Sequence, residues 1–171
     1  MISKKIEKAL HEQIVLEFES SQFYLSMASW AEVNGYTGIS SFLYKHSDEE
    51  RTHMLKLFHY VNERGGHAIV PASYEPPKGF KSIREVFEQF LKHEIQVSNE
   101  INQLVETCLK EKDFTPHNFL QWYVSEQIEE GNLARTLLDK LNLIGNDKGG
   151  LYLFDRDLET MASTMAGKPG A

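Results

Sequence analysis

The stretch from Ile83 to Cys108 reads IREVFEQFLKHEIQVSNEINQLVETC, and apolar side chains recur in it every three or four residues. This spacing places the repeated side chains along one face of an α-helix. The ladder consists of Ile83, Phe87, Phe90, Glu94, Val97, Ile101, Leu104 and Cys108. Every position is apolar except Glu94, which lies near the middle of the face that should be buried. The stretch therefore predicts a packed helix with an acid in its core-facing stripe.

Similar ladders predict three other long helices, over about residues 3–33, 37–64 and 115–145, and the ladder around Glu94 extends over about 82–112. The pairs Asn34-Gly35 and Gly65-Gly66 end the first two helices. Thr115 before Pro116 predicts the start of the fourth, with threonine as the cap and proline at the first helical position. We expect a shorter fifth helix over about residues 149–161 and a frayed tail over residues 162–171.

The connections predict how the helices are arranged. Short links between the first and second helices, and between the third and fourth, favour two antiparallel hairpins. Residues 65–81 contain three prolines and three glycines, which oppose helix formation. Such a segment can reach about 56 Å, whereas a helix of about 28 residues is about 42 Å long. We therefore predict one all-α domain over residues 1–171, a four-helix bundle whose long crossover makes helices two and three parallel.

Composition narrows the classes of function. The chain of 171 residues has 18 basic and 25 acidic side chains, a formal net charge of −7, which disfavours non-specific nucleic-acid binding. Its single cysteine, Cys108, excludes an internal disulfide. No apolar run approaches the length of a membrane span or of a signal-peptide core. We expect a cytoplasmic protein with neither a nucleic-acid partner nor a membrane partner.

The other three ladders also carry acids on their apolar faces. Glu17 lies in the first, Glu50 in the second, and Glu126 and Glu130 in the fourth. A buried carboxylate without a partner is costly, and several in one core would repel one another. A divalent or trivalent metal ion reverses this penalty because its charge compensates the acids. The acids all lie near mid-helix, so antiparallel packing brings them to one level of the bundle.

Glu50 and His53 form a Glu-x-x-His pair, which places both side chains on one helix face. Glutamates on two helices together with Glu-x-x-His are typical of di-iron helical bundles. Oxygen ligands with few nitrogens suit iron or manganese better than a structural zinc. This pattern favours a metal site over three alternatives. The spacing of Glu50 and His53 could be accidental, and Glu94 could lie at the edge of the helix interface. Glu126, Glu129 and Glu130 could form an acidic face exposed to solvent.

Three further residues lie close to the ladder acids in the sequence. Tyr24 lies on the same face as Glu17, either as a core aromatic or as a hydrogen-bond or electron donor beside the metals. His46 lies one turn before Glu50 and could support the ligands from behind. His93 precedes Glu94 and is expected on a different face.

These motifs resemble the bacterial non-haem ferritins. The resemblance rests on Leu16-Glu17-Phe18, the run EERTHM at residues 49–54, Glu94 and the run SEQIEE at residues 125–130. It covers nearly the whole chain and implies a ferritin-like bundle, a hollow cage of 24 subunits and a ferroxidase centre within each subunit. Arg51 stands where bacterioferritins carry a haem-ligating methionine, so no haem is expected.

The resemblance also implies a set of ligands. A first iron would be bound by Glu17, Glu50 and His53, and a second by Glu94 and Glu130, with Glu50 bridging the two. Tyr24 joins these five residues as a candidate catalytic residue. The glutamine that the family carries beside the two irons corresponds to Gln127. The family's third iron site corresponds to Glu49, Glu126 and Glu129, together with Glu130, which it shares with the second iron.

The function expected from this set is iron storage with ferroxidase activity. Fe(II) would be oxidised to Fe(III) by oxygen or peroxide, and ferric mineral would collect in the cage. One alternative is a di-iron oxidase or oxygenase that acts on an organic substrate and stores no mineral. Another is a helical structural module without metal chemistry.

Overall fold

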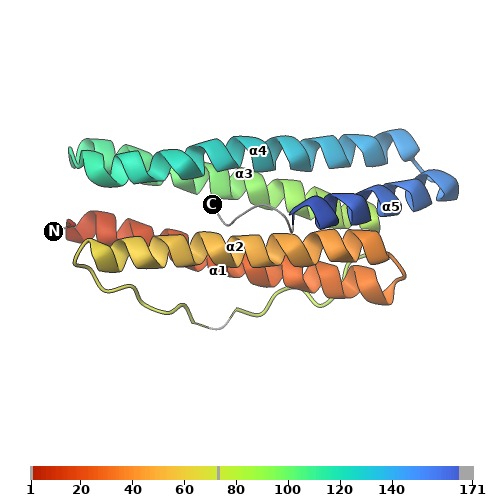
Figure 1. Ribbon diagram of the computed structural model, residues 1–171, viewed down its shortest axis with the longest axis horizontal. Coiled ribbons are helices and arrows are strands. Elements are labelled where there is room, and N and C mark those ends of the chain that lie inside the picture. Colours follow the sequence, from red (N-terminus) through yellow and green to blue (C-terminus); the bar gives the residue numbers. More distant parts are fainter. Residues whose placement is uncertain (1, 73, 166–171) are drawn as a thin grey trace.

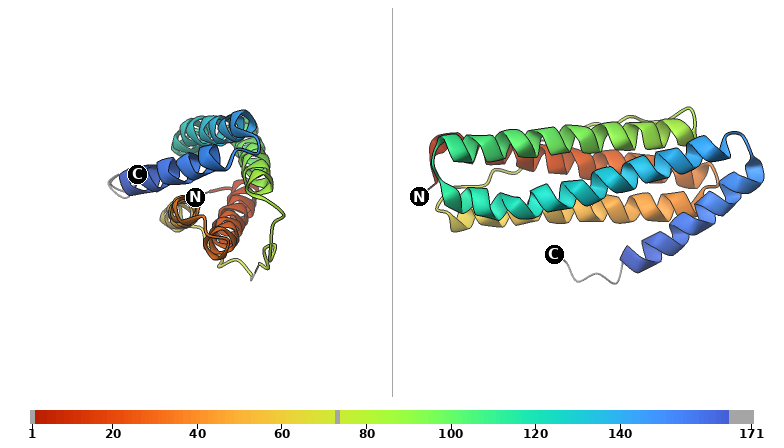
Figure 2. Two further views of the ribbon diagram at one scale, coloured as in Figure 1. Left: turned by 90° about the vertical axis from the view of Figure 1, so that its right-hand side faces the viewer. Right: turned by 90° about the horizontal axis from the view of Figure 1, so that it is seen from above.

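The computed structural model describes residues 2–72 and 74–165, which form five α-helices (Figure 1). The helices are α1 (Lys4–Val33), α2 (Thr37–Glu63), α3 (Ile83–Lys110), α4 (Phe114–Ile144) and α5 (Lys148–Met165). The pairs α1/α2 and α3/α4 are antiparallel hairpins that pack through α1 and α3, and α5 packs on α2 and α4 (Figure 2). The predicted all-α bundle with a C-terminal fifth helix is confirmed.

The helix starts follow local capping chemistry, with one correction to the prediction. Ser82 Oγ accepts a hydrogen bond from Glu85 N at 3.1 Å, as expected for a cap. At α4 the cap is Asp113, not Thr115, because the Asp113 carboxylate accepts from Thr115 N at 3.2 Å. Pro116 therefore lies at the third helical position. Proline is tolerated there because N–H groups in the first turn have no partner within the helix.

The fifth helix is longer than expected. It continues to Met165, four residues past its predicted end, so residues 162–165 do not belong to a frayed tail. Leu158 and Ala162 are buried against the apolar core, and this packing extends the helix beyond what local sequence indicates. The rest of the predicted tail, residues 166–171, lies outside the described residues. Within the described part of the chain, no helix is both long and apolar enough to cross a membrane.

The crossover between α2 and α3 runs along the bundle as predicted, which makes these two helices parallel (Figure 1). Contacts with α1 hold it near both of its ends. His67 N donates to Glu7 Oε1 at 3.1 Å, and near the other end the Phe80 ring lies 5.8 Å from Trp30. Such anchoring explains how a long non-helical connection is tolerated in a small domain.

The core has two apolar parts separated by a polar layer. One part holds Tyr24, Phe42 and Phe90, and the other holds Leu10, Leu57 and Leu104. Between them, each of the four long helices contributes buried polar side chains: Glu17, Ser20, Ser21, His46, Ser47, Glu50, His53, Glu94 and Glu130. Apolar packing on both sides therefore fixes the depth at which these groups meet.

The seam between α2 and α4 is wider than the seams within the two hairpins. Among the described residues, no Cα atom of α2 lies within 8 Å of a Cα atom of α4. Figure 2 shows the two hairpins as separate pairs joined on the side of α1 and α3. A wide seam leaves room for long side chains, and it is here that acids of α2 face acids of α4.

The docking of α5 depends on the start of α2. The cap residue of α2, Tyr36, makes no side-chain capping bond. Asp155 of α5 takes over this role, because its Oδ1 accepts from Ile39 N at 2.9 Å. Gly38 permits the approach, since a Cβ there would lie 1.9 Å from the Asp155 carbonyl oxygen.

Replacing Gly38 with alanine should therefore destabilise the subunit by about 1–3 kcal/mol, since the added methyl group forces α5 away from α2. Thermal unfolding followed by calorimetry measures the effect. Gly149→Ala is the matched control, because its Cβ would meet only Asp147 Oδ2 at 3.4 Å. Equal melting temperatures for the two variants would contradict this account of α5 docking.

Candidate metal centre

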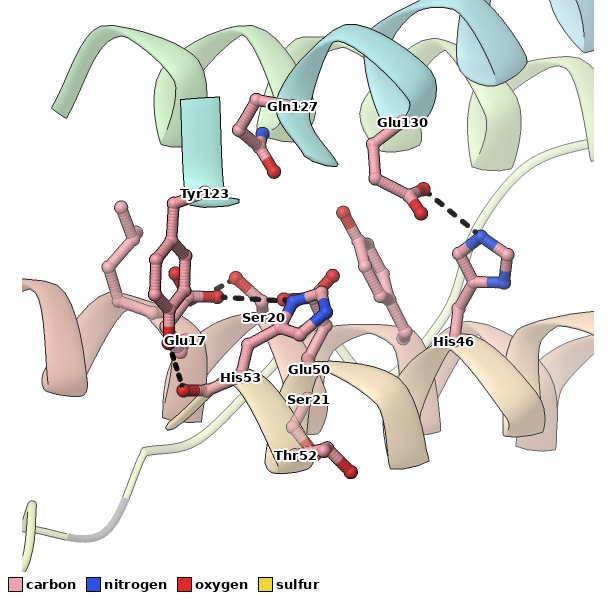
Figure 3. Close-up of polar contacts among 12 residues, drawn as sticks. Glu17, Ser20, Ser21, His46, Glu50, Thr52, His53, Tyr123, Gln127 and Glu130 are labelled. Carbon is pink, nitrogen blue, oxygen red and sulfur yellow. Dashed lines mark hydrogen bonds and ion pairs between the residues drawn. The ribbon is translucent and has the colours of Figure 1, made fainter. Parts of the chain in front are cut away.

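Three of the predicted ligands meet in the polar layer (Figure 3). Glu17 comes from α1, while Glu50 and His53 come from one face of α2. One ligand atom from each lies within 4.8 Å of the other two. His53 Nδ1 is 3.4 Å from Glu50 Oε2 and 4.0 Å from Glu17 Oε2. The residues expected to bind the first iron are thus close enough to share one ion.

Two hydrogen bonds fix the register of the helices that carry this trio. Ser21 Oγ on α1 donates to the Ser47 carbonyl at 2.8 Å, and Ser47 Oγ on α2 donates to the Ser21 carbonyl at 2.7 Å. Ser21 lies one turn after Glu17, and Ser47 lies one turn before Glu50. Because both serines are buried, these bonds hold the two ligand-bearing turns at a fixed offset.

The electrostatics of the trio are those of a cation site. Burial raises the pKa of Glu17, and the neighbouring Glu50 carboxylate raises it further. Burial likewise raises the pKa of Glu50, with Glu94 adding to the effect. Glu17 Oε2 is buried without a hydrogen-bond partner. Acids in such surroundings are stabilised by a metal ion, which supplies the missing positive charge.

Glu94 is held by two further candidates. The Tyr24 hydroxyl donates a hydrogen bond to Glu94 Oε1, and Gln127 Nε2 donates to Glu94 Oε2 at 3.2 Å. Burial and the charge of Glu130 raise the pKa of Glu94 to about 7. Of the two interpretations of Tyr24, the geometry therefore favours the hydrogen-bond donor over a plain core aromatic. Both side chains fix the orientation of a carboxylate at the centre of the layer.

His46 contacts one of the predicted ligands directly. Its Nε2 atom is 3.3 Å from Glu130 Oε2, across the seam between α2 and α4 (Figure 3). Burial by itself lowers the pKa of His46, but Glu130, together with the charges of Glu49 and Glu94, outweighs burial and the pKa is raised. His46, Glu49 and Glu130 form a second group whose ligand atoms lie within 4.8 Å of one another.

The predicted third site is only partly assembled. Glu49 and Glu126 join His53 in a third group of potential ligands. Glu126 is half-buried, and burial raises its pKa. Glu129 is exposed and belongs to none of the three groups found among the described residues. The role of Glu129 as an iron ligand stays a prediction.

Sequence reasoning missed supporting residues that tertiary packing brings to the site. His93 Nε2 lies 2.7 Å from Ser20 Oγ, and its ring packs edge-on against Tyr24 at 5.7 Å. Tyr123 donates a hydrogen bond to the His53 carbonyl at 2.7 Å. Tyr123 lies three residues before Glu126, in the ladder of the fourth helix, but this spacing does not reveal its partner. His93 is not part of the apolar ladder of α3, so side-chain spacing does not mark it. It still reaches the polar layer, because residues on more than one face of α3 contact that layer.

Comparison with known proteins identifies the family of this chain. Residues 7–144 match the family model described as a ferritin-like domain. The bacterial non-heme ferritin of Campylobacter jejuni is 44% identical over 162 residues, which cover 95% of this chain and 97% of the relative. The open pore ferritin of Archaeoglobus fulgidus superposes with a TM-score of 0.91 at 43% identity, covering 93% of this chain and 98% of that one.

The chain therefore belongs to the ferritin family. Within that family it is similar to bacterial non-haem ferritins over almost its whole length, including one from Escherichia coli at 37% identity over 161 residues. The predicted family is confirmed.

The raised pKa values predict how pH changes the effect of metal on stability. Glu94 has a folded pKa of about 7 against an ordinary 4.5, so the folded metal-free protein holds more protons than the unfolded chain between these values. Glu94 therefore makes the metal-free protein less stable as pH rises through that window. A metal ion replaces the proton, and its affinity rises with pH. Zn(II) should raise the melting temperature more above the Glu94 pKa than below it.

Differential scanning calorimetry with and without Zn(II), on either side of the Glu94 pKa, measures this difference. Glu94→Gln should reduce it, whereas Glu100→Gln, at an exposed position of the same helix, should leave it unchanged. The same Zn(II)-induced shift at both pH values would show that the buried acids do not exchange protons for metal.

Proposed function

We propose that this protein oxidises Fe(II) to Fe(III) at the buried centre and stores the product as ferric mineral in a homo-oligomeric cage. The observation that carries the proposal is the polar layer, in which each of the four long helices contributes a buried carboxylate and in which Glu17 and Glu50 lie within reach of His53. The family supports the same function, since the relatives from Campylobacter jejuni, Escherichia coli and Archaeoglobus fulgidus are named ferritins.

The ligands suggest how the reaction is assisted. Fe(II) is the substrate, and each ion gives up one electron to oxygen or peroxide. Glu17, Glu50 and His53 would hold one ion, and Glu94 and Glu130 the other, with Glu50 between them. The carboxylates stabilise the product because Fe(III) carries a higher charge than Fe(II). Tyr24 and Gln127 keep the Glu94 carboxylate oriented while the charge beside it changes.

Product iron would leave through the acids between α2 and α4. Glu49 and Glu126 lie next to His53 and are more exposed than the trio, and Glu129 is exposed one turn further along the chain from Glu126. We propose that these residues form a third iron site. A cage of 24 subunits in the cytoplasm would then collect the mineral.

Removal of one central carboxylate tests the chemistry. Glu94→Ala should slow the oxidation of Fe(II) at least tenfold, because an acid in direct contact with the substrate is lost. The same change should stabilise the metal-free protein, since it relieves repulsion with Glu130 and Glu50. Absorbance of ferric product after mixing with Fe(II) in air gives the rate. Glu100→Ala, exposed on the same helix, is the control. Unchanged oxidation in Glu94→Ala would reject the proposed site.

Iron retention separates storage from a di-iron enzyme. We expect protein given excess Fe(II) in air and then desalted to retain far more iron than its ligands can bind, co-eluting with a large assembly. Metal analysis of the size-exclusion fractions measures this. Retention of only the few ions that the ligands hold would exclude storage and favour a di-iron oxidase with an organic substrate. If the protein retains no iron, the proposed metal function is rejected and the alternative of a helical structural module is favoured.

A further inference from the structure

One residue in the wall of a groove on the side of the bundle hydrogen-bonds to a carboxylate of the metal centre. The groove lies between α1 and α3 and has a volume of about 390 Å³. Its walls include Glu12, Leu16, Glu19, Gln96, Glu100 and Leu104, together with Gln13. Gln13 is only 2% exposed, and its Nε2 donates a hydrogen bond to Glu17 Oε1 at 2.7 Å. The Gln13 amide therefore lies between the groove and a carboxylate of the first site.

This bond makes the two oxygens of Glu17 unequal. Oε1 is held by the Gln13 amide, on the same helix one turn earlier. Oε2 has no hydrogen-bond partner and lies on the side of α2, 4.0 Å from His53 Nδ1. The carboxylate is 1% exposed, so water does not compete for this oxygen. One oxygen is committed to the protein and the other is left for an ion.

We propose that Gln13 is a positioning residue that directs Glu17 to bind metal through Oε2 alone. This inference rests on the proposed function, because it needs Glu17 to be a metal ligand. Without the amide, the carboxylate could rotate about its terminal bond, bind through both oxygens or turn toward the groove. Residues that hydrogen-bond to a metal ligand typically change metal affinity 10–100-fold when they are replaced.

The test is the affinity of metal-free protein for Zn(II), measured by titration calorimetry. Gln13→Met keeps the length of the side chain but removes the donor. The variants are made in the Glu94→Gln background, which weakens the second site so that the first dominates the titration. We expect Gln13→Met to weaken the tightest Zn(II) binding about tenfold or more. Gln22→Met is the matched control, because Gln22 lies on the same helix but is not part of the groove wall. It should leave the affinity unchanged.

A purely structural role for Gln13 predicts a different result. Gln13→Met would then lower the melting temperature and leave Zn(II) affinity at the parent value, which would overturn the proposal. Gln13→Leu provides a second variant without a donor if Gln13→Met does not assemble. Crystal structures with Zn(II) give an independent readout, namely one Glu17 oxygen on the metal in the parent and a rotated or two-oxygen carboxylate in Gln13→Met.

The two proposals fail in distinguishable ways. If the parent protein binds no Zn(II) at Glu17, the metal centre itself is refuted. If the parent binds Zn(II) there but both oxygens of Glu17 contact the ion with Gln13 present, only the role of Gln13 is refuted.

Discussion

Repulsion among carboxylates inside a buried layer is the constraint on which the rest of this structure depends. Glu17, Glu50 and Glu94 are buried, and a neighbouring carboxylate further raises the pKa of each: Glu50 acts on Glu17, Glu94 on Glu50, and Glu130 on Glu94. The apolar groups on both sides of the layer stabilise the bundle enough to keep it closed despite this cost. The layer is therefore held in place by parts of the molecule that take no part in its chemistry, and its unfavourable charge gives it an affinity for cations.

The bundle accommodates this layer by being asymmetric. Within the first hairpin, Ser21 and Ser47 bond to each other's backbone and bring α1 and α2 close together. Across the bundle, α2 and α4 stay further apart, so side chains as long as Glu130 and His46 can meet between them. The narrow seam holds Glu17 and Glu50 at a fixed offset, while the wide seam is where Glu49 and His46 of α2 meet Glu126 and Glu130 of α4. The crossover follows α1 and so does not fill the wide seam.

Much of the site could be read from the helical ladders, because a period of three to four residues reports which side chains face inward. An acid in an otherwise apolar ladder, such as Glu94, is informative for that reason. The same logic does not identify the partner of a side chain on another helix. His46 was predicted to support the ligands, but the ladders do not say which one, and in the fold it faces Glu130. His93 was predicted on a different face from Glu94, and in the fold that face meets Tyr24. Both partners depend on how far apart the packed helices are.

The sequence by itself determined the helices, the crossover, the depth of the acids and the family, because these follow from local propensity, segment length and side-chain spacing. Local signals located the ends of helices less accurately. The cap of α4 is Asp113 and not the predicted Thr115, and α5 extends past its predicted end because Ala162 packs against the core. Only the tertiary structure decided which oxygen of Glu17 is free, which acid faces His46 and which helix caps α2. Hydrogen-bond partners are selected by distances of a few tenths of an ångström between helices, and no one-dimensional pattern encodes such distances.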